Sequence, residues 1–270
     1  MYKRISHIFI IMLFFIFATT PIIANMPPTI SADSAILMEE KTGMVLYEKN
    51  PDKQEYPASM TKIMTLILSL KDNHLNHIIQ ISPEAAHVES TILKEGEWIT
   101  VEQLLYLMML DSDNGAAIAL GEYISGDIDT FSSLMNQEAL QLGAMHTNFS
   151  NPNGMPNNNH YSTARDIAII ARQGLSIPHF KQIVSTKNKR IHFIHPQIYY
   201  DIENTNQLLF SYTGAIGIKT GWTNAAKGCL AAAATRKGYT LIVVVMHSDT
   251  GQSRFNEAAA LLDYGFSLRE

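Results

Sequence analysis

The sequence has very little cysteine, since Cys229 is the only one among 270 residues. A single thiol cannot form an internal disulfide, and it also excludes a cysteine-rich metal site. Basic charge is scarce as well: 20 Lys and Arg face 25 Asp and Glu, which gives a formal net charge of -5. Binding to a phosphate backbone requires clustered, excess basic residues, so we expect no nucleic-acid partner.

Long hydrophobic runs are absent except at the start of the chain, which excludes a polytopic membrane protein. There Lys3 and Arg4 precede the apolar run Ile8–Phe17, and the small residue Ala24 follows. This order is typical of a secretory signal, and the run is shorter than the about 20 residues of a membrane-spanning helix. We expect residues 1–24 to be a signal peptide, with an uncleaved anchor as the alternative. Residues 25–270 would then form an exported protein, in the periplasm or on the outer face of the cytoplasmic membrane.

The chain does have enough apolar residues, 46%, to bury one sizeable core or two modest ones, and this excludes intrinsic disorder. Strand-like runs lie near both ends, at Ala35–Met38, Met44–Tyr47, Ala215–Ile218, Cys229–Ala234 and Tyr239–Met246. Helical spacing predominates between them and closes the chain, at Ser59–Leu70, Val101–Leu110, Ala116–Ile124, Phe131–Leu142, Thr163–Gln173 and Phe255–Leu262. The simplest assembly is an α+β fold with one sheet from both termini and a helical subdomain inserted.

One Ser-x-x-Lys pair, Ser59 and Lys62, stands at the start of an expected helix, just after Pro57. Residues three apart share a helix face, so the Lys62 amine can reach the Ser59 hydroxyl. A serine hydroxyl is a poor nucleophile unless a base lies beside it, and a helix N-terminus stabilises developing negative charge. Taken alone, the pair is also compatible with an N-cap serine followed by a surface lysine.

Two further polar triplets follow along the chain. Ser112-Asp113-Asn114 interrupts two helical stretches, where the alternative is a turn with an N-cap. Lys219-Thr220-Gly221 ends an expected strand and presents a positive charge, a hydroxyl and a backbone edge that can pair with an extended peptide; the alternative is an ordinary strand end. An earlier copy, Lys41-Thr42-Gly43, lies in the expected hairpin turn, and we interpret it as a plain turn without function.

The order S-x-x-K, S-D-N, K-T-G is the signature of penicillin-binding proteins and class A β-lactamases. Five segments extend the likeness: Tyr56–Thr65, Asn151–Gly154, His160–Asp166, Asn204–Asn206 and Gly217–Gly221. With them, the chain from about Ser31 to Phe266 resembles the serine D-Ala-D-Ala carboxypeptidases of the low-molecular-weight penicillin-binding proteins. The resemblance implies a β-lactamase/transpeptidase-like α+β fold, with an antiparallel sheet flanked by helices and an inserted helical subdomain.

The resemblance also implies catalytic roles for five residues. Ser59 would attack the carbonyl between two D-Ala residues, and Lys62 would take its proton, which requires a lowered lysine pKa. Ser112 would relay the proton to the leaving amine while Lys219 holds Ser112 electrostatically. Asn114 would orient Lys62 and the substrate amide.

Four more residues are implied in substrate binding: Thr220, Gly221, Trp222 and Arg254. The backbone N–H groups of Ser59 and Trp222 would form the oxyanion hole, and Thr220 and Arg254 would hold the terminal carboxylate. The implied substrate is a peptidoglycan stem peptide ending in D-Ala-D-Ala, and β-lactam antibiotics would be covalent inhibitors. No metal or organic cofactor is expected.

The branch of the family is less constrained. A class A β-lactamase needs a Glu after S-D-N to activate water, and no Glu occurs between Glu138 and Glu203, so we predict a target of penicillin. The family often adds a β-rich domain and a membrane-binding helix; the chain stops at Glu270, and we expect both to be missing, as in short members. Some of these cut cross-links, which leaves a DD-endopeptidase open. A non-catalytic peptidoglycan-binding module is the alternative from a different class.

Four other residues are interpreted as structural. Met108 and Met109 fall in an apolar helical stretch and are expected in the core, as is Cys229 in an apolar strand. His160 lies in the Asn-rich loop 148–161, where we expect it to pack the loop.

Overall fold

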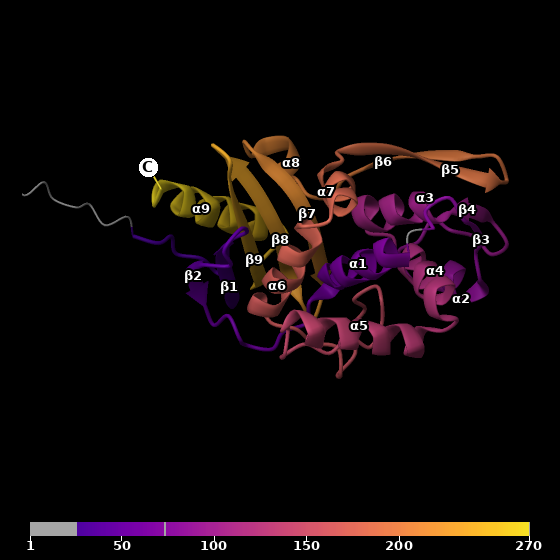
Figure 1. Cartoon of the computed structure of the whole chain (residues 1–270), viewed down its shortest axis with the longest axis horizontal. Helices are drawn as coiled ribbons and strands as arrows, with labels where there is room; N and C mark the ends of the chain where they lie inside the picture. Colours follow the sequence, from indigo (N-terminus) through magenta and orange to yellow (C-terminus); the bar gives the residue numbers. More distant parts are fainter. Residues whose placement is uncertain (1–25, 73, 270) are drawn as a thin grey trace, which may run out of the picture.

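The computed structural model describes residues 26–72 and 74–269 (Figure 1). The signal peptide expected at residues 1–24 therefore lies outside the described residues. Within the two described ranges, no helix combines the length and the apolar character needed to cross a membrane.

A five-stranded antiparallel sheet in the order β2-β1-β9-β8-β7 joins the two ends of the chain. Its strands are β1 (Ser34–Glu39), β2 (Val45–Lys49), β7 (Ala215–Thr223), β8 (Lys227–Arg236) and β9 (Tyr239–Ser248). The first strand lies between its hairpin partner and β9, with Ala35 opposite Val245. The expected sheet made from both termini is confirmed, and its antiparallel pairing agrees with the fold that the resemblance implied.

The central strand β9 explains why two cores form. Its residues 241–246 are buried without interruption, as expected for a strand covered on both faces. Because side chains alternate along a strand, Val243 and Val245 pack with helix α9 (Ser253–Ser267), whereas Val244 faces the cluster that includes the other helices. Figure 1 shows α9 on one side of the sheet and α6 and α1 on the other.

The five helical stretches expected in the middle region are present, two of them with a different first or last turn, whereas the short helices at Pro83–His87, Pro178–Ser185 and Leu208–Ser211 were not predicted. The helices of this region are α1 (Lys62–Asp72), α2 (Pro83–His87), α3 (Val101–Tyr106), α4 (Asn114–Ser125), α5 (Ile128–Leu142), α6 (Ala164–Leu175), α7 (Pro178–Ser185) and α8 (Leu208–Ser211). The helix expected from Ser59 begins with a 3₁₀ turn, η1 (Ala58–Thr61). The stretch expected at Val101–Leu110 widens into a π-helical turn, η2 (Leu107–Asp111), and Met108 and Met109 are buried there as expected.

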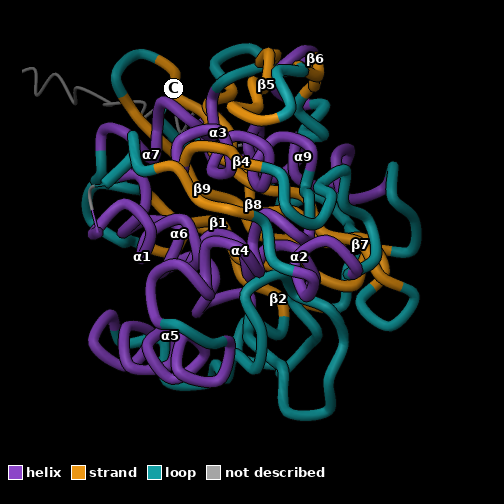
Figure 2. The backbone as a smooth tube through the Cα atoms, turned by 90° about the vertical axis from the view of Figure 1, so that its right-hand side faces the viewer, coloured by secondary structure: helices purple, strands orange, loops and turns teal. Residues whose placement is uncertain are grey.

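A second sheet was not predicted from the sequence. It has the order β3-β4-β5-β6, with β3 (Ile78–Gln80), β4 (Trp98–Thr100), β5 (Asn188–His195) and β6 (Tyr199–Glu203). The first two strands have three residues each, too few for an alternating pattern to be recognised. Figure 1 shows this sheet at the end of the molecule away from α9, and Figure 2 shows β5 and β6 next to each other at the top of the view.

The turn between β1 and β2 contains the early Lys41-Thr42-Gly43. Gly43 has φ of +75° and its N–H donates to the Glu39 carbonyl at 2.9 Å, so a glycine suits the position. Arg172 of α6 donates to the Lys41 carbonyl at 2.9 Å. The triplet is a hairpin turn, as expected.

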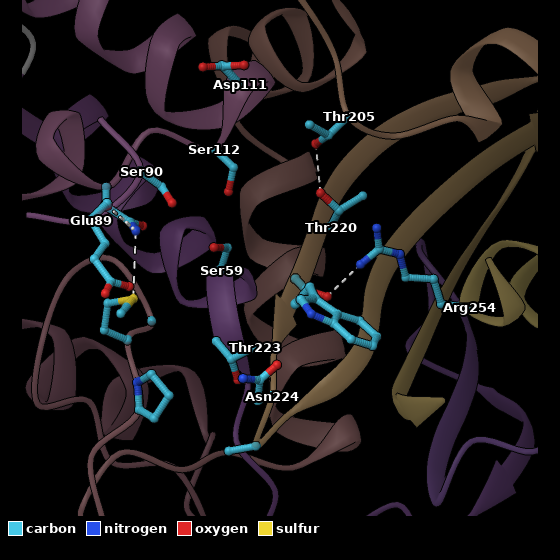
Figure 3. A pocket seen from close by; sticks show the side chains of 17 residues that line it. Ser59, Glu89, Ser90, Asp111, Ser112, Thr205, Thr220, Thr223, Asn224 and Arg254 are labelled. Atoms are coloured by element: carbon cyan, nitrogen blue, oxygen red, sulfur yellow. Dashed lines mark hydrogen bonds between the residues drawn. The ribbon is translucent and has the colours of Figure 1, made fainter. Parts of the chain in front are cut away.

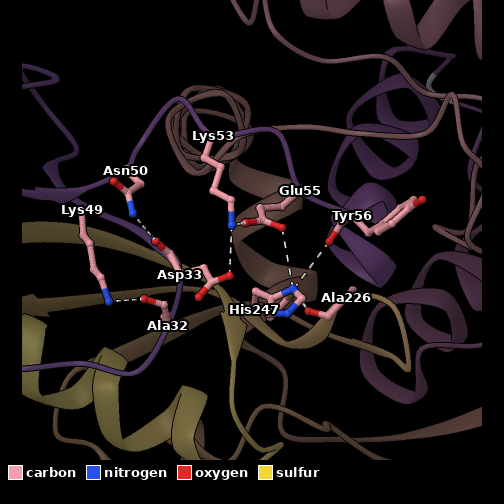
Figure 4. A network of polar contacts seen from close by, with 10 residues as sticks. Ala32, Asp33, Lys49, Asn50, Lys53, Glu55, Tyr56, Ala226 and His247 are labelled. Atoms are coloured by element: carbon pink, nitrogen blue, oxygen red, sulfur yellow. Dashed lines mark hydrogen bonds and ion pairs between the residues drawn. The ribbon is translucent and has the colours of Figure 1, made fainter.

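A polar network connects β1 with the segment that precedes the Ser59 turn (Figure 4). The Lys53 amine lies 3.0 Å from Asp33 Oδ2 and 2.6 Å from Glu55 Oε1, and His247 Nδ1 lies 3.7 Å from Glu55 Oε2. Asp33, Glu55 and His247 converge closely enough to suggest a metal site. Because the Lys53 amine already lies between the two carboxylates and lowers the pKa of Asp33, the cluster is explained as an ion-pair network.

Candidate active site

The first motif forms where β7 meets the start of α1. Lys62 is fully buried, and its Nζ lies 3.0 Å from Ser59 Oγ, 2.6 Å from Asn114 Oδ1 and 2.8 Å from the Asn153 carbonyl. The first two contacts agree with the sequence-based expectation, whereas the carbonyl of Asn153 was not anticipated. The amine is therefore held on three sides.

The surroundings of Lys62 favour a neutral amine. Burial lowers its pKa well below the usual value, and the nearby charge of Lys219 acts in the same direction, against a smaller opposing effect of Asp113. A neutral amine has two N–H bonds and one lone pair. It can donate to Asn114 and Asn153 and accept the hydroxyl proton of Ser59, so the geometry is that of a base beside a nucleophile.

The second motif occupies the junction between η2 and α4, as expected. Ser112 has φ of +67° and ends η2, and Asp113 is the N-cap of α4. The buried Asp113 carboxylate accepts from the N–H groups of Ala116 and Ile92 at 2.8 Å each, so the middle residue of the motif has a structural role. In residues 26–72 and 74–269, the Ser112 hydroxyl has no hydrogen-bond partner; it lines the cavity described below.

The third motif lies within β7, because the strand continues to Thr223; the expectation that Lys219-Thr220-Gly221 ends the strand was wrong. Pairing of Thr220 with Leu230 and of Thr223 with Lys227 holds this part of the chain in the sheet. Lys219 is buried, and its Nζ donates to the Thr220 carbonyl at 3.1 Å. Burial and the charge of Arg254 lower the pKa of Lys219 to about 7.

Gly221 allows β7 to approach the Ser59 turn closely. A Cβ placed on Gly221 would lie 3.1 Å from the Pro57 carbonyl oxygen and 3.2 Å from the Ser59 nitrogen, tighter than most real contacts. The Gly221 carbonyl accepts a hydrogen bond from Arg254 Nη1 at 2.6 Å. Trp222, which follows, is 48% exposed at the rim.

These elements enclose an open cavity of about 640 Å³ (Figure 3). Seven of the nine sequence-predicted site residues line it, namely Ser59, Ser112, Asn114, Thr220, Gly221, Trp222 and Arg254. The other two, Lys62 and Lys219, are buried and carry the amines described above. Ten further residues line the cavity and were not among the predicted site residues, although Gly154 and Thr205 belong to segments that carry the resemblance. They are Glu89, Ser90, Asp111, Gly154, Met155, Pro156, Thr205, Thr223, Asn224 and Ala225.

The Asn-rich loop, residues 148–161, also packs against the Ser59 turn. Gly154 has φ of +89°, and a Cβ placed on it would lie 1.9 Å from the Ala58 carbonyl oxygen, so glycine is required there. Thr65 of α1 donates to the Pro152 carbonyl at 2.7 Å. The segment Asn151–Gly154 of this loop is part of the resemblance, but no local sequence pattern predicts that its backbone binds the Lys62 amine.

His160 fixes the same loop, as expected for a packing residue. Its Nδ1 accepts from the Ser150 N–H at 3.0 Å, and its Nε2 lies 2.8 Å from Thr61 Oγ1. With Nδ1 accepting, the neutral ring donates from Nε2 to Thr61. Burial lowers the pKa of His160 to about 4.

This environment predicts a loss of stability in acid. Between pH 6.5 and about 4 the unfolded imidazole binds a proton that the folded one does not, so the free energy of unfolding falls by up to about 3 kcal/mol. In His160→Gln, which can still donate and accept, denaturant unfolding at pH 7 and pH 4.5 should show a smaller difference than in wild type. Equal pH dependence of the two proteins would contradict the assignment.

The family model and the related sequences agree on one family. The D-alanyl-D-alanine carboxypeptidase family, peptidase family S11, matches residues 22–250. D-alanyl-D-alanine carboxypeptidase DacF of Bacillus subtilis is 36% identical over 246 residues, which are 88% of this chain and 63% of DacF. The D-alanyl-D-alanine carboxypeptidase of Streptomyces sp. strain K15 is 35% identical over 92% of both chains.

Solved structures agree with the fold. The crystal structure of the Streptomyces K15 DD-transpeptidase superimposes with a TM-score of 0.85 at 34% identity, covering 90% of this chain and 99% of that one. D-alanyl-D-alanine carboxypeptidase DacD from Francisella tularensis gives a TM-score of 0.83 at 31% identity, covering 91% of this chain and 73% of that one.

Proposed function

The chain belongs to the D-alanyl-D-alanine carboxypeptidase family, and from this premise we propose that it is a serine DD-peptidase acting on peptidoglycan stem peptides. It removes the terminal D-Ala through an acyl-enzyme at Ser59. The chain spans 63% of the length of DacF, and the proposal concerns the part described above. We take residues 25–270 as one catalytic domain and residues 1–24 as its export signal, so that it works outside the cytoplasmic membrane.

The observation that carries the proposal is the buried amine of Lys62, 3.0 Å from Ser59 Oγ. Asn114 and the Asn153 carbonyl accept from the amine and aim its third position at the hydroxyl. Since burial favours the neutral form, Lys62 can take the Ser59 proton.

Acylation then begins with the attack of the Ser59 hydroxyl on the peptide. Ser59 Oγ bonds to the carbonyl carbon of the penultimate D-Ala as its proton moves to Lys62. The backbone N–H groups of Ser59 and Trp222 stabilise the resulting oxyanion. The C–N bond breaks, the leaving amine receives a proton through the Ser112 hydroxyl, and an ester remains on Ser59. The buried charge of Lys219 keeps the Ser112 hydroxyl polarised.

Substrate alignment follows from the edge position of β7. Within the described ranges 26–72 and 74–269, β7 pairs in the main sheet with β8 alone, so its other edge can take an extended peptide. The terminal carboxylate binds Thr220, whose Oγ1 lies 2.7 Å from Thr205 Oγ1, and Arg254, which is anchored on the Gly221 carbonyl. Departure of D-Ala makes room for water, which cleaves the ester and restores Ser59.

The proposal predicts different lifetimes for two acyl-enzymes. Between Glu138 and Glu203 no Glu is available as a deacylating base, and the buried Asp166 accepts from the His146 N–H and the Thr147 hydroxyl, each at 2.7 Å. The opened ring of a penicillin also remains in the cavity, whereas D-Ala diffuses away. We therefore expect repeated D-Ala release from a pentapeptide but near-stoichiometric inhibition by penicillin.

Both quantities are measured on one preparation: D-Ala release over time, and recovery of that activity after excess penicillin is removed. Recovery within seconds would indicate a β-lactamase instead. Absence of D-Ala release, with dimeric muropeptides split, would indicate a DD-endopeptidase with the Ser59 chemistry retained. A protein that does neither and takes up no penicillin would be a binding module.

A further inference from the structure

The second sheet has a solvent-facing side that the proposed mechanism does not use. Ile79 of β3, Ile99 of β4 and Phe193 of β5 pack in the core cluster on the inner side. Because side chains alternate along a strand, the neighbours of these residues point to the opposite side, away from the helices. We call the exposed residues there the outer face: Gln80, Trp98, Arg190, His192, Ile194 and Tyr199.

Two aromatic rings are the largest side chains of the outer face. Trp98 is 39% exposed and Tyr199 is 60% exposed. Trp98 lies opposite His195 on one side of β5. Tyr199 lies opposite His192 on the other side, and the Arg190 guanidinium lies 4.5 Å from the centroid of the tyrosine ring. With a rise of about 3.4 Å per residue and about 4.8 Å between strands, the two aromatic residues are about 14 Å apart.

The outer face is polar between the two rings, and its arginine is already paired. Arg190 Nε and Nη2 each lie 2.7 Å from a carboxylate oxygen of Asp201. The Gln80 amide and the His192 ring add hydrogen-bond donors and acceptors. A membrane surface would favour a continuous apolar face with unpaired basic residues. Flat aromatic rings that alternate with amide and imidazole groups instead match a neutral polymer with apolar ring faces and hydroxyl or acetamido groups, as in an N-acetylated glycan.

Strand β6 connects the outer face with the active-site cavity (Figure 1). The strand begins at Tyr199, and Thr205, two residues after its end, lines the cavity. Six residues of extended chain span about 20 Å. In a pentapeptide, four residues precede the scissile bond, and they span about 13–14 Å when extended. A glycan strand attached to a peptide that is bound at Ser59 can therefore extend over the outer face.

We propose that the outer face binds the N-acetylated glycan strand to which the stem peptides are attached. Sugar rings stack on Trp98 and Tyr199, and their hydroxyl and acetamido groups form hydrogen bonds with Gln80 and His192. This site is separate from the cavity in which the peptide is cleaved. The choice of the occupant rests on the proposed function, whereas glycan binding is measured without catalysis.

Tryptophan fluorescence can report on the outer face alone, because the chain contains two tryptophans, Trp98 and Trp222. In Trp222→Phe the remaining indole is that of Trp98. We expect hexa-N-acetylchitohexaose, a soluble glycan that carries no peptide, to change this fluorescence in a saturable way. Tyr199→Ala in the same background should weaken the binding about five- to tenfold. Phe210→Ala is the matched control and should keep the affinity, because Phe210 is 46% exposed but belongs to α8.

Two further measurements use the protein with both tryptophans. Isothermal titration with the same glycan should give equal Kd values before and after labelling of Ser59 by penicillin, since the outer face lies outside the cavity. D-Ala release should have a kcat/KM about five- to tenfold higher for a pentapeptide on soluble glycan strands than for the free pentapeptide. Tyr199→Ala should lower the first value to the second and leave the second unchanged.

The outcomes separate the inference from the function. Absence of both a fluorescence and a heat response to the glycan would overturn the inference, and so would an equal loss of affinity in Phe210→Ala. Loss of glycan binding after penicillin labelling would also overturn it, because the sugar would then occupy the cavity. Self-association or binding to anionic vesicles that depends on Trp98, in place of glycan binding, would assign the face to a different partner. Failure to cleave the free pentapeptide or to bind penicillin would refute the function, while the glycan titration still decides on the outer face.

Discussion

Ser59→Ala should abolish covalent labelling by penicillin and D-Ala release together. Ser59 Oγ is the hydroxyl that lies 3.0 Å from the buried Lys62 amine, and alanine leaves no atom for the ester bond. Wild-type protein incubated briefly with penicillin should gain the mass of the drug, and the variant should remain at its own mass. Intact-protein mass spectrometry measures both.

Ser90→Ala is the control for this experiment. Ser90 also lines the cavity and is exposed, but among the residues that the structure describes its hydroxyl has no hydrogen-bond partner. We expect this variant to be labelled at the wild-type rate. Labelling that persists in Ser59→Ala would refute the assignment of the nucleophile.

Lys219→Ala should slow acylation by about 10²–10³-fold, the range seen when one preorganised electrostatic group is removed. Lys219 is buried beside the cavity, and its charge contributes to the lowered pKa of Lys62. Its removal therefore changes both the field at the reacting carbonyl and the proton affinity of the base. The rate of acylation by a fluorescent penicillin, at several pH values, measures the effect.

The chain itself offers a matched control, because Lys41 also begins a Lys-Thr-Gly triplet. Lys41 is exposed in the β1–β2 turn, so Lys41→Ala should leave acylation within a few-fold of wild type. Thermal unfolding of both variants distinguishes a loss of chemistry from a loss of fold. Similar acylation rates in the two variants would show that the site has been placed wrongly.

The sequence was most informative where contacts are local. The spacing of Ser59 and Lys62 predicts their proximity, since three residues bring two side chains to one helix face. The order of the three motifs adds Ser112 and Lys219, and the structure brings both to the same cavity region. The tripeptide alone does not distinguish Lys41-Thr42-Gly43 from Lys219-Thr220-Gly221. The two differ in their surroundings, because the first lies in an expected hairpin turn and the second follows an expected strand.

Several features lacked any local signal. The Asn153 carbonyl that binds Lys62 is 91 residues away in the chain, and a backbone oxygen carries no residue-specific pattern. Glu89 looks like any exposed glutamate until the Asn114 amide is seen on its carbonyl. The sequence predicts too early an end for β7, because Thr220 and Gly221 are residue types that also occur in turns. The pairing of β7 with β8 continues to Thr223.

The amino-acid sequence by itself determines the chemical groups of this protein and their local order: a serine and a lysine three residues apart, a polar junction between helices, and a lysine in a strand. It also determines the two-ended sheet, because apolar runs near both termini must be buried together. The tertiary structure alone decides the proton affinity of Lys62, because burial and the approach of Lys219 come from segments far apart in the chain. It likewise places the positive Arg254 on one side of Ser59 and the negative Glu89 on the other, because these residues come close to Ser59 only when the sheet and the helices pack together.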